Sequence, residues 1–553
     1  MKSLALHLLF LAVTCSVGYA QKKNETEVPD KPKLVVGIVV DQMRYDFLTR
    51  YWDKYGDDGF KKLVQQGVLC RQLYYNYVPT YTGPGHASIY TGTSPAMHGI
   101  VGNHWYVKDN RATTYCTQDD KTESIGTTSP AGKQSPRNLF SSTITDQLQL
   151  TNLGDSKVIG IALKDRGAIL PAGNMADAAY WYDDACRCWI SSSFYMKELP
   201  EWVKRFNDKK YPDQYLSGEW NTLYPIQQYT ESLQDDNPYE TIVKGKTSPT
   251  FPYNLKEIAQ AYQTSSILRT TPFGNSLTTL FAIDAVISEN MGKGKSTDML
   301  CVSFSSTDYV GHSFGPYSVE SEDCYLRLDR DLATMITVIE KYLGKENVLF
   351  FLTADHGVSD VPAHLKDINI PAGYINEAVL MNKAKSFCAQ HFGDSLVLNY
   401  INNQFYLDDT KINALKQDRC EIQKKLALHL IGTESVAYAY TYCDMLQQSY
   451  VHFPAEYIQH GFHPLRSGDV MLCFKPNYME FEQRGTTHGE PFSYDAHVPL
   501  IWYGWKVKSG NVIDQRYEIT DIAVTLANML QVMEPTGATG KVIKGIIKQE
   551  KSE

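Results

Sequence analysis

Two short motifs pair a carboxylate with an imidazole. Asp308 and His312 are four positions apart in Asp308-Tyr-Val-Gly-His312, so on a helical turn both side chains would point the same way. Asp355 and His356 are adjacent and follow an apolar run. Carboxylate oxygens and imidazole nitrogens are both ligands of zinc. Each motif alone is also compatible with a helix cap or a turn, so the two indicate a metal site only in combination.

Two further residues extend the motifs to a two-metal ligand set. Asp41 stands at the end of an apolar run, and His488 lies in Thr486-Thr-His-Gly489. With the two motifs they supply three carboxylates and three imidazoles, which, given one more oxygen, suit two zinc ions side by side. Two metals about 4 Å apart can hold the attacking and leaving oxygens of an in-line displacement. The alternatives are a capping role for Asp41 and a plain loop position for His488.

Thr82 is the best candidate for the remaining oxygen ligand and for a nucleophile. It lies in Thr80-Tyr-Thr-Gly-Pro-Gly-His-Ala87, just before Gly83-Pro84, and proline is favoured at the first position of a helix. A hydroxyl at a helix entrance lies among free N–H groups, where phosphate also binds. A metal-coordinated hydroxyl loses its proton readily and becomes a usable nucleophile. Without a metal, Thr82 would only be an N-cap, and Thr80 is a competitor further from the helix start.

Three other residues suit the binding of an anion. Lys164 and Arg166 end an apolar run, and alternate positions on a strand face the same way. An arginine fork matches two phosphate oxygens, whereas lysine acts as a point charge. Asn103, in a Gly-Asn-His-Trp segment, could donate a further hydrogen bond. The alternatives are an exposed charged pair with Asp165 and an ordinary loop asparagine.

The elements that must position these residues indicate an α/β fold. Four continuous apolar runs are typical of strands buried on both faces, as in a parallel sheet. Helical patterns lie between them, which predicts a mostly parallel central sheet sandwiched by helices. Ligands bind at the carboxyl edge of such sheets, where the candidate residues follow the runs. The runs are Leu34–Val40, Val158–Leu163, Met299–Phe304 and Val348–Leu352, and the clearest helical patterns cover 276–289 and 326–342.

The remaining segments divide the chain. Residues 1–20 have the charged start, apolar stretch and small residues of a secretory signal peptide, and residues 21–32 are expected to be a flexible leader. We expect core parts at 33–189, 273–364 and 471–553, a loop-rich insertion at 190–272 and a lid insertion at 365–470. The apolar run Asp469–Phe474 is expected to return the chain to the core. A strand at Val498–Trp502 and a helix near 517–530 would complete it.

Composition limits the classes of partner. The net charge is -9 at pH 7, which argues against nucleic-acid binding by a broad basic face. No run after residue 20 is apolar for long enough to span a bilayer. An exported protein can form disulfides, although sequence alone does not give their pairing. Cys186-Arg-Cys188 is a poor metal or redox motif, because such pairs usually have two intervening residues.

Taken together, the motifs resemble the alkaline phosphatase superfamily, and most closely its phosphate-irrepressible, Lys/Arg-containing alkaline phosphatases of the PafA type. The resemblance implies two Zn²⁺ ions, one held by Asp41, Thr82, Asp355 and His356, the other by Asp308, His312 and His488. It also implies that the non-bridging phosphate oxygens bind to Asn103, Lys164 and Arg166. The matching segments are Val39–Met43, Thr82–His86, Gly102–Trp105, Lys164–Arg166, Asp308–His312, Ala354–Gly357 and Thr487–Gly489.

The resemblance implies a periplasmic or secreted enzyme, expected to be a monomer. It would hydrolyse small phosphate monoesters to inorganic phosphate and an alcohol through a phosphothreonine at Thr82. Lys164 and Arg166 favour a dianionic monoester over a diester. A phosphodiesterase or phosphonate esterase of the same superfamily, and a non-catalytic zinc- or phosphate-binding protein, stay open as alternatives. A sulfatase is disfavoured, because Thr82-Gly-Pro-Gly lacks the pattern of sulfatases, a Cys or Ser followed by Pro and Arg.

Overall fold

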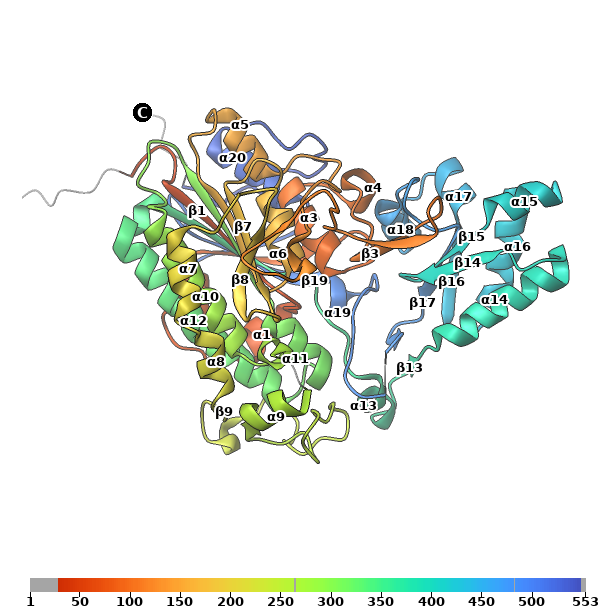
Figure 1. The fold of residues 1–553 in the computed structure, drawn as a ribbon, viewed down its shortest axis with the longest axis horizontal. Coiled ribbons are helices and arrows are strands. Elements are labelled where there is room, and N and C mark those ends of the chain that lie inside the picture. Colours follow the sequence, from red (N-terminus) through yellow and green to blue (C-terminus); the bar gives the residue numbers. More distant parts are fainter. Residues whose placement is uncertain (1–27, 263–264, 482, 549–553) are drawn as a thin grey trace, which may run out of the picture.

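The computed structural model describes residues 28–262, 265–481 and 483–548. The predicted signal peptide at 1–20, and the leader up to residue 27, lie outside the described residues. Within them, the dominant element is a ten-stranded sheet (Figure 1). Its strand order is β20 (Asn511–Glu518), β2 (Val68–Tyr74), β19 (His497–Gly504), β12 (Val348–Thr353), β1 (Leu34–Val40), β11 (Asp298–Phe304), β6 (Val158–Ala162), β7 (Ala178–Asp183), β8 (Cys188–Ser192) and β5 (Ser124–Ile125).

The four predicted apolar runs form the centre of this sheet. They are β12, β1, β11 and β6, which lie side by side and pair in parallel. Every residue of these four strands is buried, as expected for strands covered on both faces. β7 continues the parallel pairing, whereas β8 at one side and β19 at the other pair antiparallel. The predicted α/β class with a mostly parallel central sheet is confirmed.

Helices cover both faces of the sheet (Figure 1). One face packs against α2 (Phe60–Gln66), α10 (Phe273–Ser288) and α12 (Val319–Leu343), and the other against α3 (Thr82–Thr91), α5 (Ile144–Thr151), α6 (Asp165–Ala172) and α20 (Asp521–Leu530). The predicted helical patterns at 276–289 and 326–342 fall in α10 and α12. The helix predicted near 517–530 begins only at Asp521, because residues 511–518 form β20.

Of the predicted insertion at 190–272, residues 190–192 belong to β8 of the central sheet, and the described residues after them lie beside α10 and α12. They contain α7 (Glu201–Asp208), α8 (Tyr211–Leu216), α9 (Leu255–Tyr262) and the two-residue strands β9 (Glu219–Trp220) and β10 (Tyr253–Asn254). Residues 221–252, all of them described, contain only the single 3₁₀ helix Ile226–Gln228 as regular structure. Residues 221–252 are therefore mostly irregular, and the bounds 190–272 of a loop-rich insertion stay a prediction.

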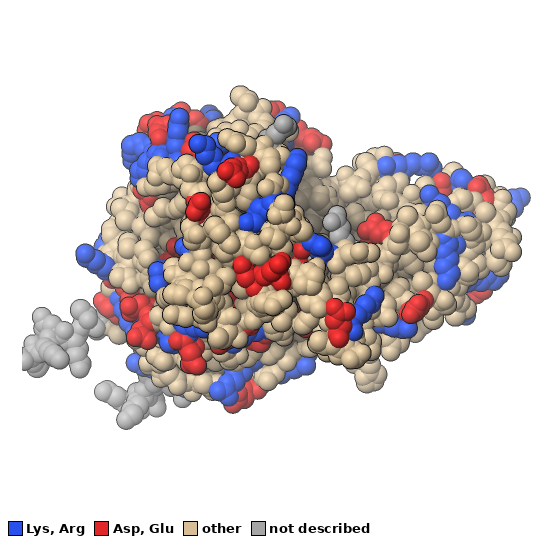
Figure 2. Space-filling view, turned by 90° about the horizontal axis from the view of Figure 1, so that it is seen from below, with Lys and Arg blue, Asp and Glu red and all other residues tan. Residues whose placement is uncertain are grey.

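A second, smaller lobe follows β12 in the chain, and we call it the lid (Figure 1 and Figure 2). Its elements lie between Glu377 and Phe474. Its antiparallel sheet has the order β14 (Val397–Ile401), β15 (Gln404–Leu407), β17 (Val470–Phe474) and β16 (Val436–Thr441). The helices α14 (Glu377–Phe392) and α16 (Arg419–Ile431) contribute to a separate hydrophobic core with this sheet. A lobe with its own sheet and core can present a surface to the main sheet without depending on it for packing.

The prediction that Asp469–Phe474 returns the chain to the core sheet is wrong. β17 covers Val470–Phe474 and pairs with β15 and β16 in the lid. All of its residues are buried, so its apolar run looks the same as that of a central strand. The chain rejoins the central sheet only at β19, which contains the predicted strand Val498–Trp502.

Two disulfides join Cys186 to Cys188 and Cys420 to Cys443. The other six cysteines of the described segments are buried free thiols. Cys186-Arg-Cys188 is thus a local cross-link in this structure. Among the described residues, no helix has both the length and the apolar character needed to cross a membrane.

Candidate active site

The four central strands deliver the predicted site residues to one edge of the sheet. Asp41 directly follows β1, Asp355 lies two residues after β12, and Lys164 lies two residues after β6. Asp308 follows β11, in the first turn of α11 (Ser306–Phe314). Because these strands are parallel neighbours, their carboxyl ends bring the four side chains together.

One compact group consists of Asp308, His312 and His488. His312 Nε2 lies 3.1 Å from Asp308 Oδ1, as the spacing of four on a helix predicts. His488 Nε2 lies 3.5 Å from the same oxygen. The ligand atoms of the three residues all lie within 4.8 Å of one another, which is compatible with a shared metal ion.

A second group lies beside the first. Ligand atoms of Asp41, Asp308 and His356 are also within 4.8 Å of one another. His356 Nε2 lies 3.5 Å from Asp41 Oδ1 and 3.5 Å from Asp355 Oδ2. Thr82 Oγ1 lies 3.5 Å from His356 Nε2 as well. The structure therefore brings all seven predicted ligands together, with Asp308 between the two groups.

The three histidines present Nε2 to the site because Nδ1 is engaged elsewhere. Each Nδ1–H donates to a backbone carbonyl: His312 to Thr486 at 2.7 Å, His356 to Gly357 at 2.9 Å and His488 to Thr80 at 2.7 Å. This arrangement fixes the tautomer and leaves the Nε2 lone pair for a metal. Burial lowers the pKa of His356 to about 3 and also lowers the pKa of His488. Burial has the same effect at His312, but the Asp308 carboxylate outweighs it, so this pKa is raised.

The three carboxylates are buried, and two of them, Asp41 and Asp355, have oxygen atoms without a hydrogen-bond partner among the described residues. Burial, reinforced by the charge of Asp355, raises the pKa of Asp41. Burial opposes ionisation of Asp308 and Asp355 too, but nearby histidines and Lys164 outweigh it and hold both pKa values below the usual range. Asp41 Oδ1 and Asp355 Oδ2 have no hydrogen-bond partner among the described residues. Buried polar atoms left in this way are those that a bound ion satisfies.

Thr82 lies at the start of a helix and beside two cations. It is the first residue of α3, and Tyr81 is the N-cap, so Pro84 is the third helical residue and not the first as predicted. The Thr82 side chain is buried, with a relative exposure of 1% for the residue. Its Oγ1 lies 3.5 Å from Lys164 Nζ and 3.4 Å from Arg166 Nη2. The helix dipole and the two side chains make this a position that favours negative charge.

Lys164 and Arg166 reach Thr82 from a helix and not from a strand. β6 ends at Ala162, Lys164 is the N-cap of α6, and Arg166 lies in the first turn, so the prediction of one strand face is wrong. Lys164 Nζ lies 2.7 Å from Asp41 Oδ2 and also pairs with Asp308. Burial lowers the pKa of Lys164, but the two carboxylates outweigh it and raise the pKa, so the side chain stays charged.

Asn103 lies at the entrance of α3, the helix that begins with Thr82. Its Oδ1 accepts a hydrogen bond from the Gly83 N–H at 2.8 Å, which leaves its amide N–H groups for another partner. Asn103 directly precedes β3 (His104–Val107), which forms a hairpin with β4 (Ala112–Tyr115). The lid contacts this hairpin, because Asn402 Nδ2 donates to the His104 carbonyl at 2.7 Å. The position of Asn103 therefore depends partly on the lid.

Gln42 is a positioning residue that the sequence patterns did not identify. Its backbone N–H donates to Asp355 Oδ1 at 3.1 Å, and its Nε2 donates to Asp308 Oδ1 at 2.9 Å. One residue thus holds carboxylates of both ligand groups. Its place directly after Asp41 was the only signal in the sequence.

His86 and Tyr115 contact three of the predicted site residues, Thr82, Asp355 and Arg166. His86 Nδ1 donates to the Thr82 carbonyl at 2.9 Å and lies 3.3 Å from Asp355 Oδ2. The spacing of four between His86 and Thr82 on α3 was visible in the sequence, although its role was not. The Tyr115 hydroxyl accepts a hydrogen bond from Arg166 Nη1 at 3.1 Å. Nothing in the sequence around Tyr115 indicates this contact.

Comparison with known proteins agrees with this fold. The family described as type I phosphodiesterase / nucleotide pyrophosphatase matches residues 35–497, and the chain belongs to this family. It is 42% identical over 544 residues to alkaline phosphatase PafA of Elizabethkingia meningoseptica, covering 98% of each chain. It is 40% identical over 558 residues to alkaline phosphatase PhoV of Synechococcus elongatus, covering 99% of this chain and 100% of PhoV.

A solved structure supports the same relationship. The crystal structure of wild-type PafA matches with a TM-score of 0.90 and 42% identity, covering 94% of this chain and 100% of that one. The predicted resemblance to the alkaline phosphatase superfamily, and to its PafA type in particular, is confirmed.

Proposed function

We propose that the chain is a two-metal alkaline phosphatase that hydrolyses phosphate monoesters to inorganic phosphate and an alcohol. The prediction of a phosphomonoesterase is confirmed by its identity to two alkaline phosphatases over nearly the whole chain. The observation that carries the assignment of the site is the environment of Thr82. Its hydroxyl lies within 3.5 Å of a nitrogen atom of His356, Lys164 and Arg166.

The proposed metals are two zinc ions. Asp41, Thr82, Asp355 and His356 would hold one, and Asp308, His312 and His488 the other. Aligned Nε2 atoms and unpartnered buried carboxylate oxygens support this assignment. When bound, such ions supply Lewis-acid stabilisation and lower the pKa of a coordinated hydroxyl.

Three side chains would bind the phosphoryl group. The Arg166 guanidinium can donate two parallel hydrogen bonds to non-bridging oxygens, and the Tyr115 contact holds it in place. Lys164 adds a point charge, and Asn103 donates through its amide. A monoester dianion matches two cations better than a diester monoanion, which favours the monoesterase over the phosphodiesterase or phosphonate esterase alternative.

The reaction would proceed in two displacements at phosphorus. Thr82 Oγ attacks in line with the ester oxygen, the bond from phosphorus to that oxygen breaks, and a phosphothreonine forms as the alcohol leaves. Water then attacks phosphorus, the bond to Thr82 Oγ breaks, and inorganic phosphate is released with the hydroxyl restored. Lys164 and Arg166 neutralise the phosphoryl oxygens in both steps, so catalysis comes mainly from positioning and charge.

An aryl phosphate monoester compared with the matching diester tests this function. We expect a much higher kcat/KM for the monoester. A higher value for the diester would make the chain a phosphodiesterase. Metal binding without phosphate release from any monoester would make it a non-catalytic binding protein.

Export, a monomeric state and the absence of nucleic-acid binding complete the proposal. The pattern of residues 1–20 supports export to the periplasm or beyond the cell, and the two disulfides suit an oxidising compartment. Figure 2 shows acidic and basic side chains interspersed on one face of the molecule. Together with the net charge of -9, this supports small phosphate monoesters over nucleic acid as the substrates.

A further inference from the structure

A cavity of about 230 Å³ adjoins the candidate active site, and we call it the acidic cavity. His488 and Tyr81 form part of its wall, whereas Asn103, Lys164 and Arg166 do not line it. Its fifteen lining residues include four carboxylates and no lysine or arginine. The carboxylates are Glu377 at the start of α14 in the lid, and Glu480, Glu490 and Asp495.

The buried carboxylates of this cavity have few partners. Asp495 is fully buried, and its Oδ1 has no hydrogen-bond partner among the described residues. Glu490 is buried too, and its Oε1 accepts a hydrogen bond from Asn403 Nδ2 at 2.8 Å. The Tyr400 hydroxyl donates to Glu480. These neutral partners do not balance the negative charge of the ionised carboxylates. Burial raises the pKa of Glu480 to about 8, so the cavity favours a cation most at alkaline pH.

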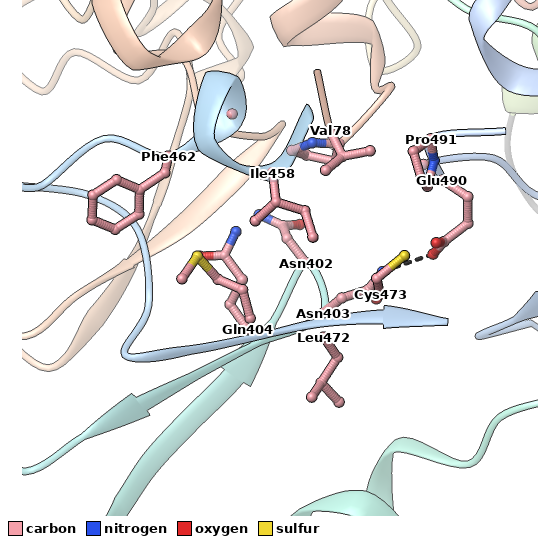
Figure 3. Close-up of a pocket in the computed structure, with 14 residues that line it drawn as sticks. Val78, Asn402, Asn403, Gln404, Ile458, Phe462, Leu472, Cys473, Glu490 and Pro491 are labelled. Atoms are coloured by element: carbon pink, nitrogen blue, oxygen red, sulfur yellow. Dashed lines mark hydrogen bonds between the residues drawn. The ribbon is translucent and has the colours of Figure 1, made fainter. Parts of the chain in front are cut away.

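A second cavity beside Glu490 is too small to take part. It shares Asn402, Asn403 and Glu490 with the acidic cavity, and Figure 3 shows Glu490 next to Cys473 at its edge. Its volume is only about 30 Å³, room for about one water molecule. The second cavity therefore has no room for an organic group.

The geometry suits an organic cation better than a metal ion. Among the described residues, two groups of three Asp, Glu, His or Cys side chains have ligand atoms within 4.8 Å of one another. Both groups lie in the candidate active site. No three carboxylates of the acidic cavity converge closely enough. Four tyrosines also line it, Tyr81, Tyr400, Tyr478 and Tyr494. Aromatic faces attract ammonium groups, most of all when these are shielded from water.

Tyr81 connects the acidic cavity to the nucleophile. It directly precedes Thr82, and its ring packs edge-on against His488, with 5.6 Å between ring centroids. Tyr81 also lines the acidic cavity together with Glu480 and Glu490. Tyr81 and His488 therefore form part of the boundary between the candidate active site and the acidic cavity.

We propose that the acidic cavity binds a positively charged leaving group, so that the preferred substrates are aminoalkyl phosphate monoesters. The inference rests on the proposed phosphomonoesterase function. The phosphate end of such a substrate meets Lys164 and Arg166, and the ammonium end meets Glu480 and the tyrosines. The product alcohol is then an amino alcohol.

A pair of substrates with the same shape tests the inference. Phosphocholine carries a quaternary nitrogen, and 3,3-dimethylbutyl phosphate has carbon at that position. Burial raises the pKa of Glu480 to about 8, so the assays are made at about pH 9, where more of this carboxyl is ionised. We expect kcat/KM to be about tenfold or more higher for phosphocholine, equivalent to about 1.4 kcal/mol.

Two variants and a control locate the effect. In Glu480→Gln and Glu377→Gln, the ratio of kcat/KM between the two substrates should fall towards one, while thermal melting checks folding. Glu434→Gln removes an exposed lid carboxylate that does not line the acidic cavity, so the ratio should keep its wild-type value. Equal kcat/KM in the wild type, or an unchanged ratio in both cavity variants, overturns the inference. If no monoester is hydrolysed at all, including an aryl phosphate, the proposed function itself is overturned.

Discussion

Nε2 of His356 lies 3.5 Å from Oγ1 of Thr82, although the two residues are 274 positions apart in the chain. His356 follows a central strand, and Thr82 begins a helix that packs on one face of the sheet. The contact joins the imidazole of a proposed metal ligand to the proposed nucleophile.

Removal of the Thr82 hydroxyl should abolish most of the activity. Thr82→Ala leaves no atom to form the bond to phosphorus, so kcat/KM for an aryl phosphate should fall by at least about 10³-fold. Thr82→Ser keeps a hydroxyl at the same place and should retain far more activity. Steady-state kinetics of the two variants give the comparison. If Thr82→Ala lost no more than Lys164→Ala, Thr82 would not be the nucleophile.

Loss of Lys164 should affect monoesters more than diesters. Lys164→Ala removes one of the two cations near Thr82, and a monoester carries one more negative charge than a diester. We expect kcat/KM to fall by about 10- to 100-fold for the monoester, equivalent to about 1.4–2.8 kcal/mol, and by less for the diester. Lys204→Ala removes a surface lysine and serves as the control. Equal losses for both esters would remove Lys164 from phosphate recognition.

Gly85 should tolerate no side chain, because α3 approaches Asp355 closely at this point. A Cβ atom at Gly85 would lie 2.3 Å from the Asp355 carbonyl oxygen and 2.8 Å from its Cβ. Gly85→Ala should therefore displace Asp355 and lower both metal content and kcat. Gly294→Ala is the matched control, since nothing lies within 4 Å of an added Cβ there. Full metal content in Gly85→Ala would show that metal binding does not depend on the exact position of Asp355.

A buried carboxyl pair outside the active site should make stability depend on pH. Glu240 and Glu320 are fully buried, and three of their four carboxylate oxygens have no hydrogen-bond partner among the described residues. Burial raises the pKa of both groups, and the charge of Glu320 raises that of Glu240 further. Folding therefore favours the protonated pair. This stability is fully present below about pH 4 and is lost as the pH rises through the raised values.

Glu240→Gln should remove part of this loss of stability at high pH, because glutamine keeps the shape of a protonated carboxyl and does not ionise. We expect the variant to gain about 1–3 kcal/mol over the wild type at alkaline pH and little at about pH 4. Thermal or urea unfolding across this range measures the difference. Glu198→Gln, an exposed position, should show no such trend. A constant difference at every pH would contradict the assignment of the raised pKa values.

The central strands and the residue types of the candidate metal site were predictable from the sequence. The sheet to which β17 belongs and the contacts of Gln42 were not. Continuous apolar runs define β1, β6, β11 and β12, and the spacing of Asp308 and His312 fixes their common helix face. By contrast, β17 has the same buried run but belongs to the lid, because pairing is set by distant partners. Gln42 contacts Asp308 and Asp355 across more than 260 positions, and no local pattern encodes such a contact.

Removal of the bound metal should show whether the activity depends on it. We expect the purified enzyme to contain two metal ions per chain and to lose activity on an aryl phosphate when a chelator removes them. Added Zn²⁺ should restore that activity, because the ligands around Thr82 are already held in place by Gln42 and by the histidine Nδ1 contacts. Undiminished activity in a preparation shown by elemental analysis to hold no metal would contradict the account.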